Sequence, residues 1–184
     1  GCIAIAEHVK IKYARMYHKI DINPKSCMAE TYPLGSVMYK QLMDKVMSEH
    51  TQEYTLDPHC KEVLEELVTK GFVFCIVSSR SEKTLESCKA FVKKYHLPIS
   101  ACYGTDDRSK KDLCSKIHAR AMLDDGLKKL LELQELPMDL FFLMREWNTH
   151  ERITKEMQNK ISPLTDWRTF ALEMEKMKLR HEAI

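Results

Sequence analysis

The sequence predicts an α/β fold, with a doubly wound parallel sheet of about five strands and a short helical cap insertion. Three observations support this prediction. Five short apolar segments lack polar–apolar alternation, which is typical of strands buried on both faces of a parallel sheet. Beyond residue 56 these segments alternate with helical patterns, which favours right-handed crossovers. Residues 9–56 interrupt the alternation.

The predicted strands are short and apolar. Their ranges are 2–6, 72–77, 100–103, 120–123 and 139–144. The second and fifth, "FVFCIV" and "DLFFLM", carry apolar residues at successive positions. Both faces of these two strands are therefore expected to be buried.

Helices are predicted between these strands and after the last one. The helix within 57–71 has apolar residues at helical spacing and Gly71 as its C-cap. The helix within 81–98 can begin at Ser81 and cannot continue past Pro98. Further helices are predicted within 109–118, 126–136 and 165–177.

The 184 residues suit one domain with a substantial core. Residues 1–8 and 57–184 are predicted to form that core. Residues 9–56 are predicted to form the cap over one end of the sheet, with a helix at about 34–49.

The sequence carries no direct signal for a nucleic-acid-binding, membrane-spanning or secreted protein. The formal net charge of +2 gives no direct signal for nucleic acid or an anionic membrane. No run approaches the length of a membrane span, and the short apolar start lacks the basic lead of a signal peptide. The chain is therefore expected to be intracellular, in the cytoplasm or nucleus.

Seven cysteines without a C-x-x-C pair are interpreted as free, buried thiols in a reducing compartment. A zinc site including His59 and Cys60 is the alternative, although the ligand spacing of a zinc motif is absent.

Polar stretches follow the predicted strands or begin the next helix. They are Ala6-Glu7-His8, Ser78-Ser79-Arg80, Lys110-Lys111 and Asp124-Asp125. The carboxyl ends of parallel strands converge on one crevice, so these groups are expected to meet there. A hydroxyl, a lysine and two carboxylates would suit a phosphate site with a metal-holding acidic corner.

Each stretch also has a purely structural interpretation. Ser78 to Ser81 can form a turn and a helix cap, and the two lysines can be a solvated helix start. Asp124 and Asp125 can cap the helix that follows them.

In their order, these stretches resemble the haloacid dehalogenase superfamily of phosphatases, and within it the small 5'(3')-deoxyribonucleotidase-like group. The resemblance implies that Ser78 of "CIVSSR" binds phosphate and that Lys111, or alternatively Lys110, is the family lysine. It also implies that Asp124 and Asp125 of "MLDDG" are the acidic pair. The segments "WNTHERI" and "DWRTF" extend the resemblance over nearly the whole chain.

The first motif departs from the family pattern, which is Asp-x-Asp-Gly after the first strand. The corresponding segment here is "CIAIAEHVK". Ala6 replaces the aspartate that becomes an aspartyl-phosphate, His8 replaces the acid/base, and Val9 replaces the glycine. Alanine has no nucleophilic atom. Glu7 is the nearest carboxylate, but on a strand it would point to the opposite face.

The sequence therefore predicts a catalytically inactive pseudophosphatase that acts as a protein-interaction or scaffold module, within a larger protein or complex. The alternatives are an active nucleotidase-type phosphohydrolase with an unusual nucleophile, and a sensor that holds phosphate or a nucleotide through Ser78 and Lys111. No cofactor is expected. Magnesium is predicted to be absent because two carboxylates are missing, and His8 is expected to bond to an aspartate. The partner surface is expected on residues 28–47 and the final helix.

Overall fold

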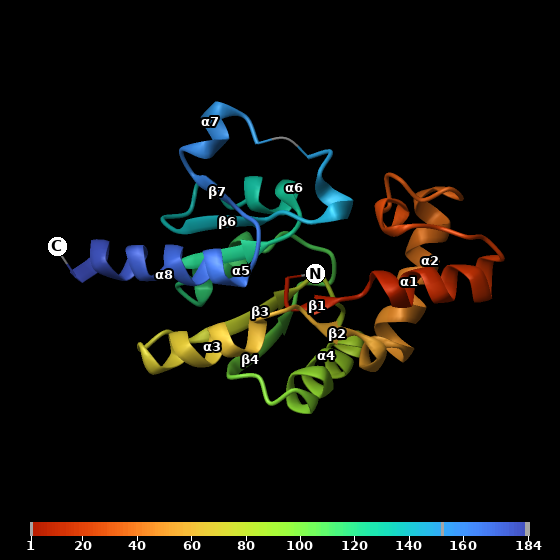
Figure 1. Cartoon of the computed structure of the whole chain (residues 1–184), viewed down its shortest axis with the longest axis horizontal. Coiled ribbons are helices and arrows are strands. Elements are labelled where there is room, and N and C mark those ends of the chain that lie inside the picture. Colours follow the sequence, from red (N-terminus) through yellow and green to blue (C-terminus); the bar gives the residue numbers. More distant parts are fainter. Residues whose placement is uncertain (1, 152, 183–184) are drawn as a thin grey trace.

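The computed structural model describes residues 2–151 and 153–182, and it has the α/β fold that the sequence predicts (Figure 1). Strands β3 (Phe74–Ser78) and β4 (Ile99–Gly104) pair in parallel. Strands β5 (Ala121–Asp124), β6 (Asp139–Leu143) and β7 (Ile161–Leu164) form a parallel group in that order. All five predicted strands are confirmed, with shifted ends.

The first strand differs from the expectation of one continuous parallel sheet. Strand β1 (Ala4–Ile5) pairs antiparallel with β2 (Thr55–Leu56), so hydrogen bonds divide the described strands into three groups. Residues beside β1 connect to the β5–β6–β7 side: the Trp167 indole donates to the Cys2 carbonyl at 2.9 Å. Figure 1 shows β1 between the two parallel groups.

The predicted core helices are present, although most are shorter than expected. They are α3 (Cys60–Thr69), α4 (Glu82–Lys94), α5 (Lys111–Lys116), α6 (Leu127–Leu131) and α8 (Trp167–Glu182). Gly71 adopts a φ of 92° directly after α3, as expected of a C-cap. A further short helix, α7 (Lys155–Gln158), precedes β7. None of the helices in the described residues is long and apolar enough to cross a membrane.

Helices also fill the segment between β1 and β2. They are α1 (Glu7–Tyr13), the π-helical turn η1 (Ala14–His18), η2 (Pro24–Ser26), α2 (Gly35–Glu49) and η3 (Thr51–Glu53). The expected helix at 34–49 is confirmed as α2. Figure 1 shows α1 and α2 to one side of the strands.

The core lies on both faces of the β5–β6–β7 group. Phe141 packs with the α3 and α8 side chains, including Leu67 and Phe170, whereas Phe142 packs on the opposite side with Leu130. Burial of successive β6 residues is what the unalternating sequence predicted. A third cluster, which includes Val9, Leu42 and Phe91, joins α1 and α2 to α4.

The cysteines are free, as predicted. The expectation that they are buried holds for Cys27, Cys60 and Cys114. It is wrong for Cys75, which is exposed on β3 beside Ser100, where the two side chains are 3.2 Å apart.

Candidate functional site

Ala6 lies where β1 ends and α1 begins. Its methyl group is buried, and its carbonyl accepts the amides of Val9 and Lys10 at 3.1 and 2.9 Å. Because the chain turns into a helix directly at this residue, the side chains of Glu7 and His8 follow helical rather than strand geometry.

Glu7 is buried beside this turn. One carboxylate oxygen, Oε2, accepts the Ala6 amide at 3.2 Å. The other, Oε1, lies 3.8 Å from the Lys10 amine and accepts no hydrogen bond. Lys10, itself buried, donates to the Cys27 carbonyl at 3.1 Å. The carboxylate nearest to Ala6 is thus held against the cap by a neighbouring lysine.

His8 lies on the surface. Its Nε2 bonds to the backbone carbonyl of Glu53 at 3.0 Å. The expectation that His8 bonds to Asp124 or Asp125 is wrong, because the second position of α1 turns the ring toward η3.

Lys110 and Asp124 form a buried ion pair with 2.5 Å between Nζ and Oδ2. The second oxygen of Asp124 accepts the Gly126 amide at 2.9 Å, which caps the turn into α6. Burial lowers the pKa of Lys110, but the charge of Asp124, its hydrogen bond and the nearby Cys2 and Asp125 together raise the pKa above its usual value. The Lys110 amine is therefore charged and has its hydrogen-bond partner in Asp124.

Lys111 points elsewhere. Its amine pairs with Glu135 on the surface, and its side chain is 40% exposed. Of the two candidate lysines, the structure thus places Lys110 next to Asp124 and leaves Lys111 outside this group.

The residues after β3 face several directions. The Ser78 hydroxyl accepts the Arg80 amide at 3.3 Å, as in a turn. The Ser79 hydroxyl accepts from Lys129 at 3.1 Å, which connects this turn to α6. The Arg80 guanidinium is buried and donates to the Met47 carbonyl at 2.7 Å. Arg80 therefore connects the β3 turn to the helices that precede β2.

Asp125 lies close to strand β1. The Cys2 sulfur is 3.9 Å from its Oδ1, and its carbonyl accepts the amide of the Asn148 side chain at 2.8 Å. Burial and the charges of Asp125 and Asp124 raise the pKa of the Cys2 thiol. The contact between the acidic pair and the β1 segment is thus made by Cys2, and not by a carboxylate on that strand.

A second buried ion pair was missed by the sequence analysis. Arg145, directly after β6, pairs through Nη2 with the buried carboxylate of Asp57, which follows β2. Burial raises the pKa of Asp57, although Arg145 lowers it in part. The position of Arg145 directly after a predicted strand was a usable signal, whereas β2 is too short for a detectable pattern.

The donor set does not fit the magnesium site implied by the family resemblance. Such a site needs a carboxylate at the end of β1, where this chain has Ala6, and Asp124 is already engaged by Lys110. Among the side chains that the structure describes, no three of His, Cys, Asp or Glu are grouped to hold a metal ion. The absence of magnesium from the protein remains a prediction.

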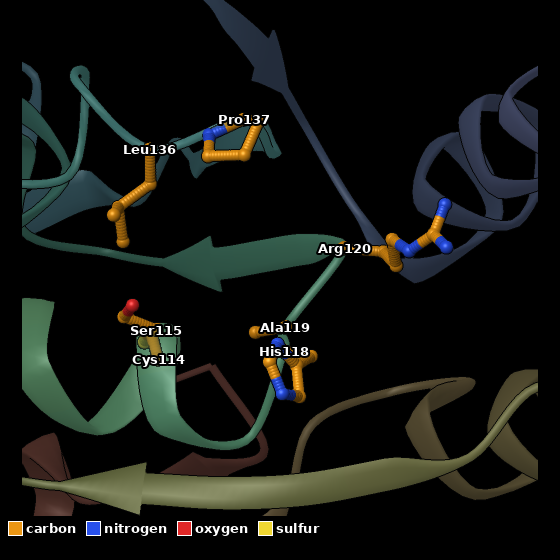
Figure 2. A pocket seen from close by; sticks show the side chains of 7 residues that line it. All are labelled: Cys114, Ser115, His118, Ala119, Arg120, Leu136 and Pro137. Atoms are coloured by element: carbon orange, nitrogen blue, oxygen red, sulfur yellow. The ribbon is translucent and has the colours of Figure 1, made fainter.

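The two cavities described in the structure lie at the other end of the strands. One, of about 330 Å³, is lined by the residues labelled in Figure 2: Cys114, Ser115, His118, Ala119, Arg120, Leu136 and Pro137. A neighbouring cavity of about 400 Å³ shares Arg120 and extends to Asp139. Both adjoin the amino ends of β5 and β6, whereas Ala6 and Asp124 lie at carboxyl ends.

The family model for haloacid dehalogenase-like hydrolases matches residues 4–112, more than half of the chain, and the chain belongs to this family. Solved structures share the fold at low identity. A predicted phosphatase from Clostridium acetobutylicum has a TM-score of 0.63 and 13% identity, covering 96% of this chain and 94% of that one. A haloacid dehalogenase-like hydrolase from Streptococcus pneumoniae has a TM-score of 0.61 and 12% identity, covering 94% and 93%. No curated protein sequence matches the chain.

Proposed function

We propose that this chain is a non-catalytic member of the haloacid dehalogenase-like family that serves as a protein-interaction or scaffold module in a larger protein or complex. The observation that carries the proposal is Ala6, a buried methyl group at the position that the resemblance assigns to the nucleophile. Covalent phosphoryl transfer needs a nucleophilic atom there.

The surrounding charges support the same proposal. Lys110 is neutralised by Asp124, and Arg145 by Asp57. A phosphate would have to displace one of these buried carboxylates before it could bind either cation, which adds a desolvation cost. The finer similarity to the deoxyribonucleotidase-like group is part of this proposal and describes ancestry rather than activity.

An active phosphohydrolase is the alternative, and one observation favours it. The Oε1 atom of Glu7 is buried without a hydrogen bond and lies one residue from the expected nucleophile position. A carboxylate oxygen can attack phosphorus only when it is held in line with the bond to the leaving group. The salt bridge to Lys10 holds it toward the cap instead.

Hydrolysis assays separate the two. With nucleoside monophosphates or an aryl phosphate and magnesium, we expect only background hydrolysis. Turnover of about 1 s⁻¹, the low end of the usual enzyme range, would overturn the proposal if it disappears in Glu7→Gln.

The interaction role is tested on α2. Val37 is 71% exposed there, within the expected partner surface, whereas Val73, 77% exposed, lies outside it just before β3. In a pull-down with the intact parent protein, Val37→Asp should abolish partner capture and Val73→Asp should not. Equal capture by both variants would place the partner elsewhere.

A further inference from the structure

Cysteines outside the candidate site gather where α4 meets the β3–β4 pair. Cys88 lies on α4, Cys102 on β4 and Cys75 on β3, and all three are free thiols. Cys88 and Cys102 are both partly exposed residues.

The geometry brings Cys88 and Cys102 together. Alternate residues of β4 share a face, so Cys102 and Gly104 lie on the same side of the strand. That side is covered by α4, because the Leu85 side chain is 3.7 Å from the position that a Cβ on Gly104 would take. Cys88 follows Leu85 by one helical turn and therefore lies over Cys102.

The charges around this pair differ for the two sulfurs. Direct interaction with Cys102 and the charge of Arg80 together lower the pKa of Cys88 to about 7, against the effect of burial. Arg80 is held there by donating to the hydroxyl of Ser87, at 3.1 Å. The same interaction raises the pKa of Cys102. Near neutral pH a substantial fraction of Cys88 is thus a thiolate while Cys102 stays a thiol, which is the arrangement of a nucleophile and its resolving partner.

We propose that Cys88 and Cys102 form a peroxide-sensitive dithiol that closes into a disulfide. The Cys88 thiolate attacks one oxygen of hydrogen peroxide: an S–O bond forms, the O–O bond breaks, and the released hydroxide takes up a proton to become water. The Cys102 sulfur then attacks the Cys88 sulfenic acid. An S–S bond forms, the S–O bond breaks, and hydroxide leaves as a second water with the Cys102 proton. Two thiols are oxidised and one peroxide is reduced.

Peptide mapping tests the proposal on the full chain. After exposure to hydrogen peroxide, blocking of free thiols and trypsin digestion, residues 84–89 and 95–108 should appear as one cross-linked species. This species should weigh two hydrogen atoms less than the sum of its peptides and should disappear on reduction. A cross-link from Cys75 to Cys102, or irreversible oxidation of Cys88 without a cross-link, would overturn it.

Single variants sharpen the test. Cys88→Ser should lose both the cross-link and reaction with a sulfenic-acid probe, whereas Cys102→Ser should lose the cross-link but retain a probe-reactive Cys88. Cys75→Ser should behave like the unmodified chain. If Cys102→Ser removes probe reactivity as well while circular dichroism shows an intact fold, the assigned roles are wrong. These outcomes do not depend on whether the chain hydrolyses phosphate.

Discussion

The amine of Lys110 and the carboxylate of Asp124 lie 2.5 Å apart in a buried pair that joins the start of α5 to the end of β5. A buried pair adds little net stability when it is intact, because desolvation offsets the attraction, but removing one partner leaves an uncompensated charge.

Replacing Lys110 should therefore destabilise the fold strongly. We expect Lys110→Met to lower the free energy of unfolding by about 3 kcal/mol, measured by urea denaturation. The matched variant is Lys111→Met, which breaks only the exposed pair with Glu135 and should cost less than about 1 kcal/mol. Equal effects of the two substitutions would show that Asp124 finds another partner or stays neutral.

The Arg145–Asp57 pair should make stability depend on pH once it is broken. Without Arg145, the pKa of Asp57 in the folded state should rise further above the unfolded value of about 3.9, because burial already raises it. The stability that such a group contributes to the folded state is present below its unfolded pKa and is lost as pH rises through its folded pKa. Arg145→Met should thus cost about 3 kcal/mol at neutral pH and clearly less near pH 4.

A double substitution checks this assignment. In Arg145→Met with Asp57→Asn, no carboxylate remains at position 57 to titrate, so the fall in stability from pH 4 to pH 7 that Arg145→Met shows should disappear. If the double variant keeps that fall, another group causes the pH dependence.

The strands could be predicted because burial on both faces leaves a local signature. Phe141 and Phe142 are adjacent in sequence and pack on opposite sides of β6. Strand β2 has no such signature: two residues form it, and its pairing of Leu56 with Ala4 depends on contact across the whole insertion. Local sequence cannot encode that contact.

The sequence predicted which residue types lie near the candidate site more reliably than it predicted where their side chains point. Successive helical residues point about 100° apart, so the starting residue of α5 decides which of Lys110 and Lys111 faces Asp124. The helix starts at Lys111, and tertiary packing rather than local sequence determines that start. The same reasoning applies to His8, whose ring would lie differently on a strand that continued beyond Ala6.

Arg80 should be needed to hold the helices before β2 against α4. Its guanidinium donates to the Met47 carbonyl, the Thr51 hydroxyl and the Ser87 hydroxyl, at 2.7, 3.0 and 3.1 Å. Lysine keeps the charge but cannot make this fork of bonds. We expect Arg80→Lys to cost about 2 kcal/mol and to increase amide hydrogen exchange in α2. Arg108→Lys, at an exposed position, is the control and should leave exchange in α2 unchanged.

The reactivity of Cys88 should report its lowered pKa. The alkylation rate follows the thiolate fraction, so it should reach half its maximum near pH 7 rather than at the usual thiol value of about 8.5. Cys102→Ser removes the interaction that contributes most to the lowering and should move the midpoint upward. A midpoint that stays near 7 in this variant would assign the effect to Arg80 instead.

Restoring both first-motif aspartates should fail to restore activity. In Ala6→Asp with His8→Asp, the side chain at position 6 would be buried at the end of β1. The side chain at position 8 would point toward Glu53 on the surface. An acid/base must reach the reacting oxygen to act, so the double variant would gain a carboxylate at one position and no proton donor at the other. The new buried charge should also lower stability by about 2 kcal/mol at neutral pH. Phosphatase assays beside the single variant Ala6→Asp should show both within tenfold of background. Activity in the double variant far above that of Ala6→Asp would mean that residue 8 reaches the site and that α1 rearranges when substrate binds.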